Sequence, residues 1–235
     1  MKKISAVIQA RLNSKRLKKK MLLPILGKPM IFYLIERLKT LNGIDEIVLS
    51  TSTSEINYEL IEYVKSLGIK TFYDDDVNED DLCTRLYKTC KRFKCDAILK
   101  INGDCPIPEI NILKRILKIF EHNQEVDYIS NKNNDHCPLG YSAEIISFKS
   151  LKWCFKNLKN CNDREFVAKW IGEDRKHFKK IFIKSKVNLK YTKHLMIDTL
   201  EDFRVVEEIF SKLYKKKKYF NMRDIEYYFK RALKF

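Results

Sequence analysis

Four short apolar segments, separated by stretches with helical periodicity, occupy the first hundred residues of this 235-residue chain. The apolar segments predict strands at 4–8, 44–51, 69–73 and 97–101, and the stretches between them predict helices at 31–41, 56–67 and 82–90. The first segment lacks the polar alternation of a half-exposed strand, which is typical of a strand covered on both faces. Strands that alternate with helices favour a mainly parallel sheet between helical layers. The sequence therefore predicts a three-layer α/β/α fold.

The rest of the chain is predicted to be richer in helix. A helix at 109–122 and a strand at 126–130 precede a polar segment, 131–140, which is predicted to be an active-site loop or turn. An apolar strand is predicted at 194–198, and further helices are predicted at 149–159, 163–172, 200–214 and 222–233. The sequence has no internal repeat and no linker, and its length suits a single domain spanning 1–235.

The net charge of +16, from 47 basic and 31 acidic residues, raises the question of nucleic-acid binding. The basic excess is spread along the chain, and the run at 215–218 is not accompanied by a nucleic-acid motif. A lysine-rich solvated surface with some attraction for anionic substrates is the simpler interpretation, so a nucleic-acid partner is not expected.

Two further observations bear on location. The seven cysteines are an odd number and contain no Cys-x-x-Cys pair, which favours reduced thiols over disulfides or a zinc ribbon. No apolar stretch reaches membrane-spanning length, and the start of the chain lacks the pattern of a signal peptide. We therefore expect a cytoplasmic protein without a membrane partner.

A dense cluster of cations follows the first predicted strand. Ser14 lies among them, and the cations are Arg11, Lys15, Arg16, Lys18, Lys19 and Lys20. Planar Arg side chains and Lys point charges are suited to binding a polyphosphate. A solvated basic loop would have the same composition, and charge alone does not separate the two interpretations.

Polar residues also follow the second and fourth predicted strands. The second strand runs into Ser50-Thr51-Ser52-Thr53-Ser54, and the fourth into Asn102-Gly103-Asp104-Cys105-Pro106. Because ligands of doubly wound sheets bind beyond the carboxyl ends of the strands, these ends are expected to converge on one site.

Two aspartates are candidates for binding Mg²⁺. Asp104 is held between a glycine and a proline after a buried strand, although an aspartate in this position is often an ordinary turn or helix cap. Asp198 ends the strand predicted at 194–198, and Thr199 and Asp202 have the spacing of a helix cap, which leaves the Asp198 side chain for a metal.

Five motifs together resemble the cytidylyltransferases of the spore coat polysaccharide biosynthesis type. They are Gln9-Ala10-Arg11, Ser14-x-Arg16-Leu17-x-x-Lys20, Gly27-Lys28-Pro29-Met30, Gly103-Asp104-Cys105-Pro106 and Asp198-Thr199-x-Glu201-Asp202-Phe203. These enzymes are related to those that make CMP-sialic acid and CMP-3-deoxy-manno-octulosonate. The resemblance implies a Rossmann-like nucleotidyltransferase fold. It also implies Mg²⁺-dependent transfer of CMP from CTP to a sugar or sugar-like keto acid for surface glycan biosynthesis, with release of pyrophosphate.

The resemblance also implies roles for individual residues. The catalytic candidates are Arg11, Lys20, Asp104 and Asp198, of which the two aspartates would bind Mg²⁺. The nucleotide-binding candidates are Ala10, Arg11, Ser14, Arg16, Lys20, Thr51, Ser52, Arg85 and Asn102. The acceptor-binding candidates are Gly140, Glu144, Arg164, Glu165 and His194. A purely structural role is an equal alternative for Arg85 and Glu144. His194 is either a general base or a residue that supports the metal site.

The sequence departs from the family pattern at several positions. Lys18-Lys19 stands where the family has Pro-Gly. Leu139 and Ser142 replace acids, and Phe166 replaces a histidine. Because these last changes lie on the acceptor side, the acceptor stays open. The alternatives are another nucleotide or a phosphorylated acceptor, or a non-catalytic protein that binds nucleotide or nucleic acid. The family also makes a homodimer possible.

Overall fold

The computed structural model describes residues 2–74, 78–123, 125–131, 139–184 and 195–232. Its centre is a seven-stranded sheet with the strand order β5-β4-β1-β6-β8-β7-β9. The strands are β1 (Ile4–Gln9), β4 (Glu46–Ser50), β5 (Lys70–Phe72), β6 (Ala97–Asn102), β7 (Tyr128–Ser130), β8 (Glu144–Ser147) and β9 (Lys180–Phe182). Strands β5, β4, β1 and β6 are mutually parallel, which confirms the prediction for the first hundred residues. Among the described strands of this sheet, only β8 runs antiparallel to its neighbours, β6 and β7.

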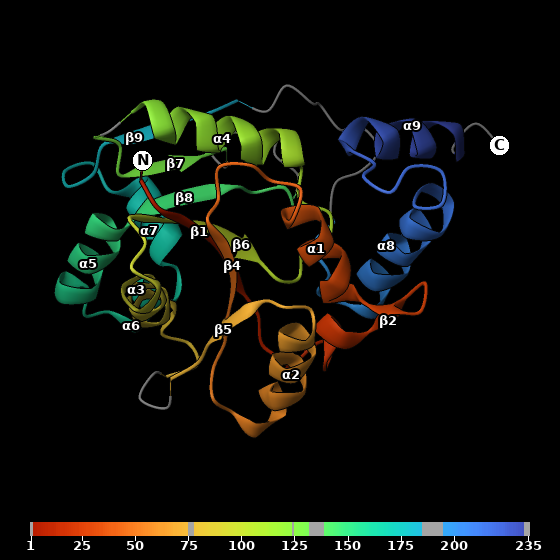
Figure 1. The fold of residues 1–235 in the computed structure, drawn as a ribbon, viewed down its shortest axis with the longest axis horizontal. Coiled ribbons are helices and arrows are strands. Elements are labelled where there is room, and N and C mark those ends of the chain that lie inside the picture. Colours follow the sequence, from red (N-terminus) through yellow and green to blue (C-terminus); the bar gives the residue numbers. More distant parts are fainter. Residues whose placement is uncertain (1, 75–77, 124, 132–138, 185–194, 233–235) are drawn as a thin grey trace.

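Helices cover both faces of this sheet. They are α1 (Met30–Leu38), α2 (Tyr58–Ser66), α3 (Leu82–Phe93), α4 (Ile110–His122), α5 (Phe148–Asn157), α6 (Cys161–Glu165), α7 (Val167–Glu173), α8 (Leu200–Leu213) and α9 (Met222–Ala232). Two 3-10 turns, η1 (Lys20–Leu22) and η2 (Glu55–Asn57), and a small hairpin of β2 (Pro24–Ile25) and β3 (Lys28–Pro29) complete the fold. Figure 1 shows the sheet at the centre, α5 at one end of the molecule, and α8 and α9 at the other.

Alternate side chains of the central strands supply two separate apolar cores. Ala6 and Ile8 of β1 pack into the core that includes residues of α1, α2, α4 and α8. Val7 of β1 and Ile98 of β6 face the opposite way, into the core formed with α3, α5 and α7. Successive side chains of a strand point to opposite faces, so one buried strand contributes to both cores. The predicted three-layer α/β/α architecture is thereby confirmed.

The structure corrects two predicted elements. Residues 195–198 are not a strand: Leu195 N donates to Leu139 O at 2.9 Å and Ile197 N to Asp104 O at 2.9 Å, without a continuous ladder. His194, the first residue of that predicted strand, lies outside the described residues, as does most of the predicted loop 131–140. The single helix predicted at 163–172 is instead two helices, α6 and α7, interrupted at Phe166.

The helix cap predicted at Thr199 is confirmed, and Asn221 makes the equivalent contacts before α9. Thr199 Oγ1 accepts from Asp202 N, and Asp202 Oδ2 accepts from Thr199 N, as in a capping box. Asn221 Oδ1 accepts from Asp224 N at 3.2 Å, and Asp224 Oδ2 accepts from Asn221 N at 2.7 Å.

The described residues include no helix with the length and hydropathy needed to cross a bilayer. Six described cysteines carry free thiols, and all of them except Cys161 are buried. Burial among apolar side chains keeps such thiols inert and gives them a packing role.

Candidate active site

The carboxyl ends of β1, β4 and β6 lie side by side at one edge of the sheet. Gln9, the last residue of β1, is in register with Ser50 of β4 and with Asn102 of β6. The residues that follow these strands therefore start from neighbouring positions. This edge is the ligand-binding edge of a doubly wound sheet.

Lys20 lies between the two aspartates that were predicted to bind a metal. Its Nζ is 2.9 Å from Asp104 Oδ2 and 3.0 Å from Asp198 Oδ1, and it also donates to Ile197 O at 2.6 Å. The residue is only 5% exposed, so the ammonium group is held by these oxygens largely away from water. Three segments that are distant in sequence, η1, the end of β6 and the start of α8, are thereby joined at one cation.

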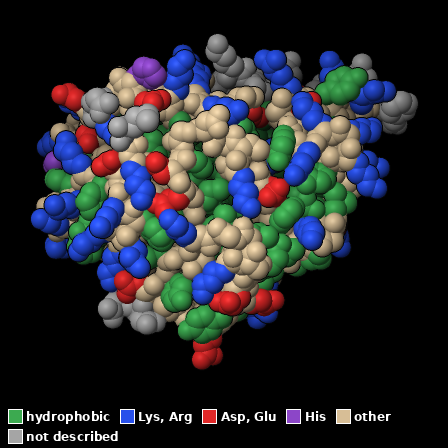
Figure 2. Space-filling view, in the orientation of Figure 1, with side chains coloured by type: hydrophobic (Ala, Val, Ile, Leu, Met, Phe, Trp, Pro, Cys, Tyr) green, Lys and Arg blue, Asp and Glu red, His purple; other side chains and the backbone are tan. Residues whose placement is uncertain are grey.

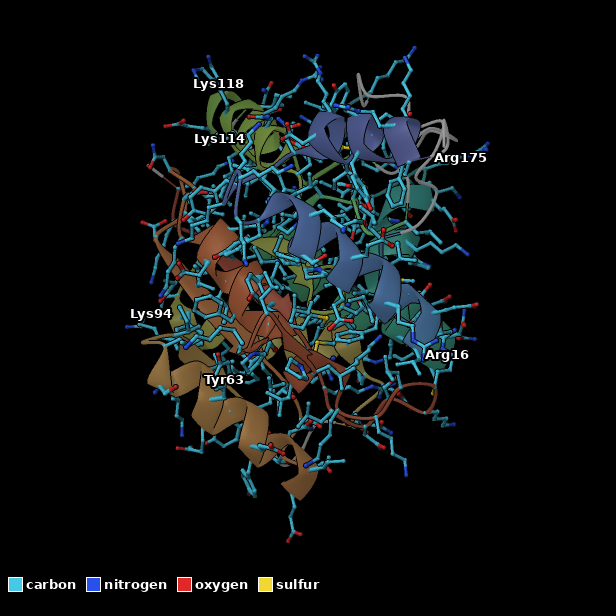
Figure 3. All side chains as sticks on the ribbon, turned by 90° about the vertical axis from the view of Figure 1, so that its right-hand side faces the viewer. Arg16, Tyr63, Lys94, Lys114, Lys118 and Arg175 are labelled. Atoms are coloured by element: carbon cyan, nitrogen blue, oxygen red, sulfur yellow. The ribbon has the colours of Figure 1, made fainter. Side chains whose placement is uncertain are left out.

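Arg16 adds a second cation to this cluster. Its Nη2 is 2.9 Å from Asp198 Oδ2, while its side chain remains 66% exposed. Figure 3 shows Arg16 beside one end of α8, with its side chain on the surface of the molecule. An exposed guanidinium can exchange a carboxylate for a phosphate at little cost, because both present oxygens to the same planar donors.

Gly103 and Ile197 fix the backbone around the two aspartates. A Cβ on Gly103 would lie 2.6 Å from Ala10 Cβ, so only glycine allows β6 to approach the end of β1 so closely. Gly103 N donates to Gln9 O at 2.8 Å, and Ile197 N donates to Asp104 O at 2.9 Å. The two carboxylates are therefore carried on backbone segments that are bonded to each other.

The donor set at this edge fits Mg²⁺ bound together with a nucleotide. Asp104 and Asp198 place two hard carboxylate oxygens around one cationic group, Lys20 Nζ. Mg²⁺ is commonly bound by one or two carboxylates, with substrate phosphates and water supplying the other ligands. No group of three or more His, Cys, Asp or Glu side chains among the described residues could hold a metal without such help.

The basic loop between β1 and η1 presents its cations in different ways. Arg11 Nη1 is 2.7 Å from Asp80 Oδ1 and 3.7 Å from Glu79 Oε2. Ser14 Oγ is 3.5 Å from Leu17 N, at the limit of a hydrogen bond. Lys19 adopts a left-handed backbone conformation, with φ of 53°. Glycine adopts a positive φ at little cost, which explains why the family pattern has glycine at the position of Lys19.

Arg85 lies in the first turns of α3, beside the end of β4. Its Nη1 donates to Glu79 O at 2.7 Å, and its Nε has no partner among the described residues although the residue is only 7% exposed. Burial, with the nearby charge of Arg11, lowers the pKa of Arg85 to about 10, so it stays cationic at neutral pH. Such a buried, incompletely bonded guanidinium is available to a ligand.

The remaining nucleotide-binding candidates also lie at this edge. Ser52 Oγ donates to Glu79 Oε1 at 3.0 Å, and Thr51 Oγ1 is buried without a partner among the described residues. Ala10 is 7% exposed, and Asn102 Oδ1 accepts from Gln9 Nε2 at 2.7 Å. Through contacts with Arg11, Ser52 and Arg85, Glu79 links three of the predicted nucleotide-binding residues.

The acceptor-side candidates are more dispersed. Glu144 is 2% exposed and bonds to Lys100 and Tyr128 inside the fold. Arg164 donates from Nε and Nη2 to Asp81 Oδ2 at 2.9 and 2.8 Å, an interaction that ties α6 to α3. Gly140 has φ of 98° and packs against the backbone of 195–196, and Glu165 is exposed. Arg164 therefore does not join the Lys20 cluster, and a ligand role for these residues stays a prediction.

Three residues of this region were not among the sequence candidates: Gln9, Glu79 and Lys100. A lysine within an otherwise apolar strand is the one local signal that could have identified Lys100. Glu79 belongs to an acidic run whose contact with Arg11 becomes visible only in the folded chain.

A family model described as cytidylyltransferase matches residues 5–234. The chain belongs to the cytidylyltransferase family. Over 208 residues this cytidylyltransferase is 34% identical to the uncharacterized protein MJ1063 of Methanocaldococcus jannaschii, covering 88% of this chain and 83% of the relative. Over 220 residues it is 24% identical to the spore coat polysaccharide biosynthesis protein SpsF of Bacillus subtilis, covering 90% and 88%. The relationship inferred from the five motifs is thereby confirmed.

Solved structures agree with this assignment. A cytidylyltransferase from Leptospira borgpetersenii superposes with a TM-score of 0.91 at 25% identity, covering 100% of this chain and 96% of the other. A CMP:2-keto-3-deoxy-manno-octonic acid synthetase complexed with CTP superposes with a TM-score of 0.68 at 16% identity, covering 89% and 99%, which shows a shared fold. This cytidylyltransferase therefore has the nucleotidyltransferase fold and is a nucleotidyltransferase by family.

Proposed function

We propose that this cytidylyltransferase transfers CMP from CTP to a sugar or a sugar-like keto acid, in a Mg²⁺-dependent reaction that releases pyrophosphate. The product would be an activated sugar for surface polysaccharide or glycan biosynthesis. The observation that carries the proposal is the joining of Asp104 and Asp198 through Lys20 at the carboxyl edge of the sheet. A relative named 3-deoxy-manno-octulosonate cytidylyltransferase, from Bdellovibrio bacteriovorus, is 27% identical over 164 residues and supports a sugar acid as acceptor.

The reaction requires an acceptor oxygen to attack the α-phosphorus while pyrophosphate departs in line. Charge builds on the phosphate oxygens, so fixed cations lower the barrier. Lys20 is buried and held in place, and Arg11 and Arg16 are near the surface and paired with carboxylates. We infer that Arg11 and Arg16 exchange these carboxylates for the β- and γ-phosphates, and that Lys20 neutralises charge close to the reacting phosphate.

Asp104 and Asp198 would hold Mg²⁺, which when bound would shield the negative charge of the phosphate oxygens from the acceptor. The carboxylates are 22% and 14% exposed, so they remain accessible from solvent. Lys20 would remain close to both acids and limit their mutual repulsion.

The surface charge favours an enzyme that attracts small anions. Figure 2 shows Lys and Arg scattered over the visible face, with acidic side chains among them, instead of gathered in one stripe. That distribution is unlike a nucleic-acid interface, which concentrates its cations.

The buried free thiols support a reducing compartment, and we propose the cytoplasm. A homodimer stays a prediction that light scattering in solution tests.

A thermal-shift panel with CTP, UTP, GTP and ATP, each with Mg²⁺, tests the nucleotide. A ligand at a hundredfold excess over Kd stabilises a protein by about 2.7 kcal/mol, which is a readily measured shift. We expect CTP to give the largest shift. A larger shift with another nucleotide supports the alternative of a transferase that uses that nucleotide. In a parallel run with oligonucleotides, a shift with these and with none of the four nucleotides contradicts the proposal. A screen of keto sugar acids and sugar phosphates for pyrophosphate release then identifies the acceptor.

The variant Asp104→Asn tests the metal-binding carboxylates. Loss of this carboxylate is expected to slow pyrophosphate release by about 100-fold or more, because Mg²⁺ would be held less tightly and the charge on the phosphate oxygens would be less well neutralised. The matched control is Asp96→Asn, since Asp96 precedes β6 at the opposite edge of the sheet, where it accepts from Lys3 N at 2.8 Å. Near-normal turnover by Asp104→Asn, with a normal melting temperature, would exclude this role.

A further inference from the structure

A continuous row of buried hydrogen bonds leads from the interior of the sheet to its ligand-binding edge. Tyr128 OH donates to Glu144 Oε1 at 2.7 Å, and Lys100 Nζ lies 2.9 Å from Glu144 Oε2. The same Nζ donates to Asn102 Oδ1 at 3.0 Å, and Gln9 Nε2 donates to Asn102 Oδ1 at 2.7 Å. The row therefore crosses β7, β8, β6 and β1 and ends at the last residue of β1.

This row places charged and polar groups in the protein core, where removing them from water costs free energy. Lys100 is 8% exposed, and Glu144 and Tyr128 are each 2% exposed. A buried ion pair recovers little more than the cost of removing two charges from water, and apolar residues of similar volume often stabilise a fold as well. Stability alone therefore gives a weak reason for the Lys100–Glu144 pair, and a role in fixing neighbouring groups is a stronger one.

The pair determines how two amide side chains are oriented. An ammonium group only donates, so the oxygen of the Asn102 amide must face Lys100. That oxygen also lies against Gln9, so Gln9 must present its NH₂ group to it. The Gln9 oxygen, Oε1, then points elsewhere as an acceptor, and it has no partner among the described residues although it is buried. A buried unpaired acceptor costs about 1–3 kcal/mol, which a ligand that donates to it would recover.

The free acceptor belongs to a side chain on the face of the sheet that α3 covers. Ser50, in register with Gln9, directs its Oγ to Thr89 of α3 at 2.9 Å, so this face of the sheet end lies against α3. Arg85 is four residues earlier on α3, and its O accepts from Thr89 Oγ1 at 2.7 Å. Arg85 Nε is buried and also without a partner among the described residues. An unpaired acceptor and an unpaired donor therefore lie at the same end of this face.

We propose that Gln9 Oε1 accepts a hydrogen bond from the 4-amino group of cytosine, and that Lys100 is the positioning residue that orients Gln9 for this role. The proposal rests on the use of CTP proposed above. Cytosine and uracil have nearly the same size and differ at this edge by an amino group in place of a carbonyl oxygen. A fixed acceptor attracts the amino group and repels the carbonyl, so orienting Gln9 selects CTP over UTP.

Calorimetric titration of the full chain with CTP and with UTP, in the presence of Mg²⁺, tests this without knowledge of the acceptor. The wild-type protein is expected to bind CTP more tightly. In Gln9→Met the ratio of the Kd for UTP to the Kd for CTP is expected to fall about tenfold. The variant loses both the hydrogen bond to CTP and the repulsion of UTP. Gln9 is partly exposed, so this variant is expected to fold.

The double variant Lys100→Met/Glu144→Met tests the positioning role, because it removes both charges and leaves neither buried without a partner. It retains Gln9 but frees both amides to turn over, so the ratio of Kd values is again expected to fall. The single variant Lys100→Arg keeps a side chain that only donates, so its ratio of Kd values is expected to stay at the wild-type value. The control is Arg37→Met, which removes another buried cation. Arg37 lies on α1, which packs on the other face of the sheet from α3, and donates to Phe220 O. This variant should lower only the melting temperature.

Each outcome separates the two proposals. An unchanged ratio in Gln9→Met overturns the contact with cytosine, and an unchanged ratio in the double variant overturns the positioning role of Lys100. If the wild-type protein binds CTP and UTP equally well, both the contact of Gln9 with cytosine and the positioning role of Lys100 are overturned. The proposed function still stands in that case if pyrophosphate release depends on CTP. Wild-type protein that binds neither nucleotide overturns the proposed function itself.

Discussion

At the scale of single residues, Asp81 links the start of α3 to α6. Its carboxylate accepts from Thr84 N at 2.9 Å as the cap of α3 and pairs with Arg164. Burial by itself raises the pKa of Asp81, but the hydrogen bonds from Thr84 and Arg164 outweigh it, so the pKa lies below its ordinary value of 3.8. Because the folded-state pKa is lower than the unfolded-state value, the stabilisation is present above that value and is lost as the pH falls through the folded-state pKa.

Asp81→Asn is therefore expected to destabilise the protein in a pH-dependent way. At neutral pH the free energy of unfolding should fall by about 1–3 kcal/mol, since Asn can still cap the helix but no longer pairs with Arg164. The difference from wild type should shrink as the pH falls below 3.8. Urea titrations from pH 3 to pH 7 measure this, with the 64% exposed Asp80, changed to Asn, as the control. A difference that stays constant down to pH 3 would assign the effect to packing.

Residues of the site differ in how far the sequence alone could identify them. Lys20 and Asp104 belong to local motifs, and their neighbours in sequence predicted their position at strand ends. The contacts they make were not predictable, because Lys20 meets Asp104 across 84 residues and Asp198 across 178. Arg11 likewise meets Asp80 across 69 residues. Ion pairs of this kind depend on the folded topology, and no local pattern records them.

At the scale of elements, the contrast between β6 and β8 shows the same limit. β6 was predicted because the run 97–101 is apolar except for Lys100, and the observed strand extends one residue further, to Asn102. β8 was missed because it is four residues long and begins with Glu144, a residue type that is almost never fully buried without a partner. That partner is Lys100, 44 residues earlier. The strand predicted at 194–198 failed for the opposite reason, since an apolar pattern was present but its backbone bonds go to isolated positions in two loops.

The segment that carries Asp198 depends on a close approach to Gly140. Gly140 has φ of 98°, and a Cβ there would lie 2.7 Å from both Leu195 C and Met196 N. Gly68 also has a positive φ, of 75°, but a Cβ there would meet nothing within 4 Å. Both glycines therefore adopt a positive φ, but only Gly140 lies against the backbone of another segment.

Gly68→Ala and Gly140→Ala form a matched pair. Alanine in a left-handed conformation is expected to cost about 1–2 kcal/mol at either position. Gly140→Ala must also displace the backbone before Asp198, so its free energy of unfolding should fall by about 3 kcal/mol or more and CTP turnover should fall with it. Chemical denaturation and pyrophosphate release are the measurements. Equal losses of stability, with turnover unaffected in both, would show that this contact does not position Asp198.

At the scale of the whole molecule, one sheet supplies both apolar cores. Neighbouring residues of β1 and β6 pack into opposite cores, so neither core can lose its strands without exposing the other. The single domain spanning 1–235, which was predicted from the length of the chain, stays a prediction, and this sharing agrees with it. A domain built in this way is expected to unfold in one cooperative step.

The two tryptophans of the chain provide a direct test of that cooperativity. Trp153 of α5 and Trp170 of α7 stack with ring centroids 5.5 Å apart and pack against the core that contains Val7 and Ile98. Tryptophan fluorescence therefore reports on one helical layer, whereas far-ultraviolet circular dichroism reports on all the helices. In urea the two signals should change with the same midpoint and slope, because loss of this layer uncovers the shared sheet. A fluorescence transition at clearly lower urea than the dichroism transition would instead mean that α5 and α7 leave an otherwise folded sheet, and the chain would then contain two separately stable units.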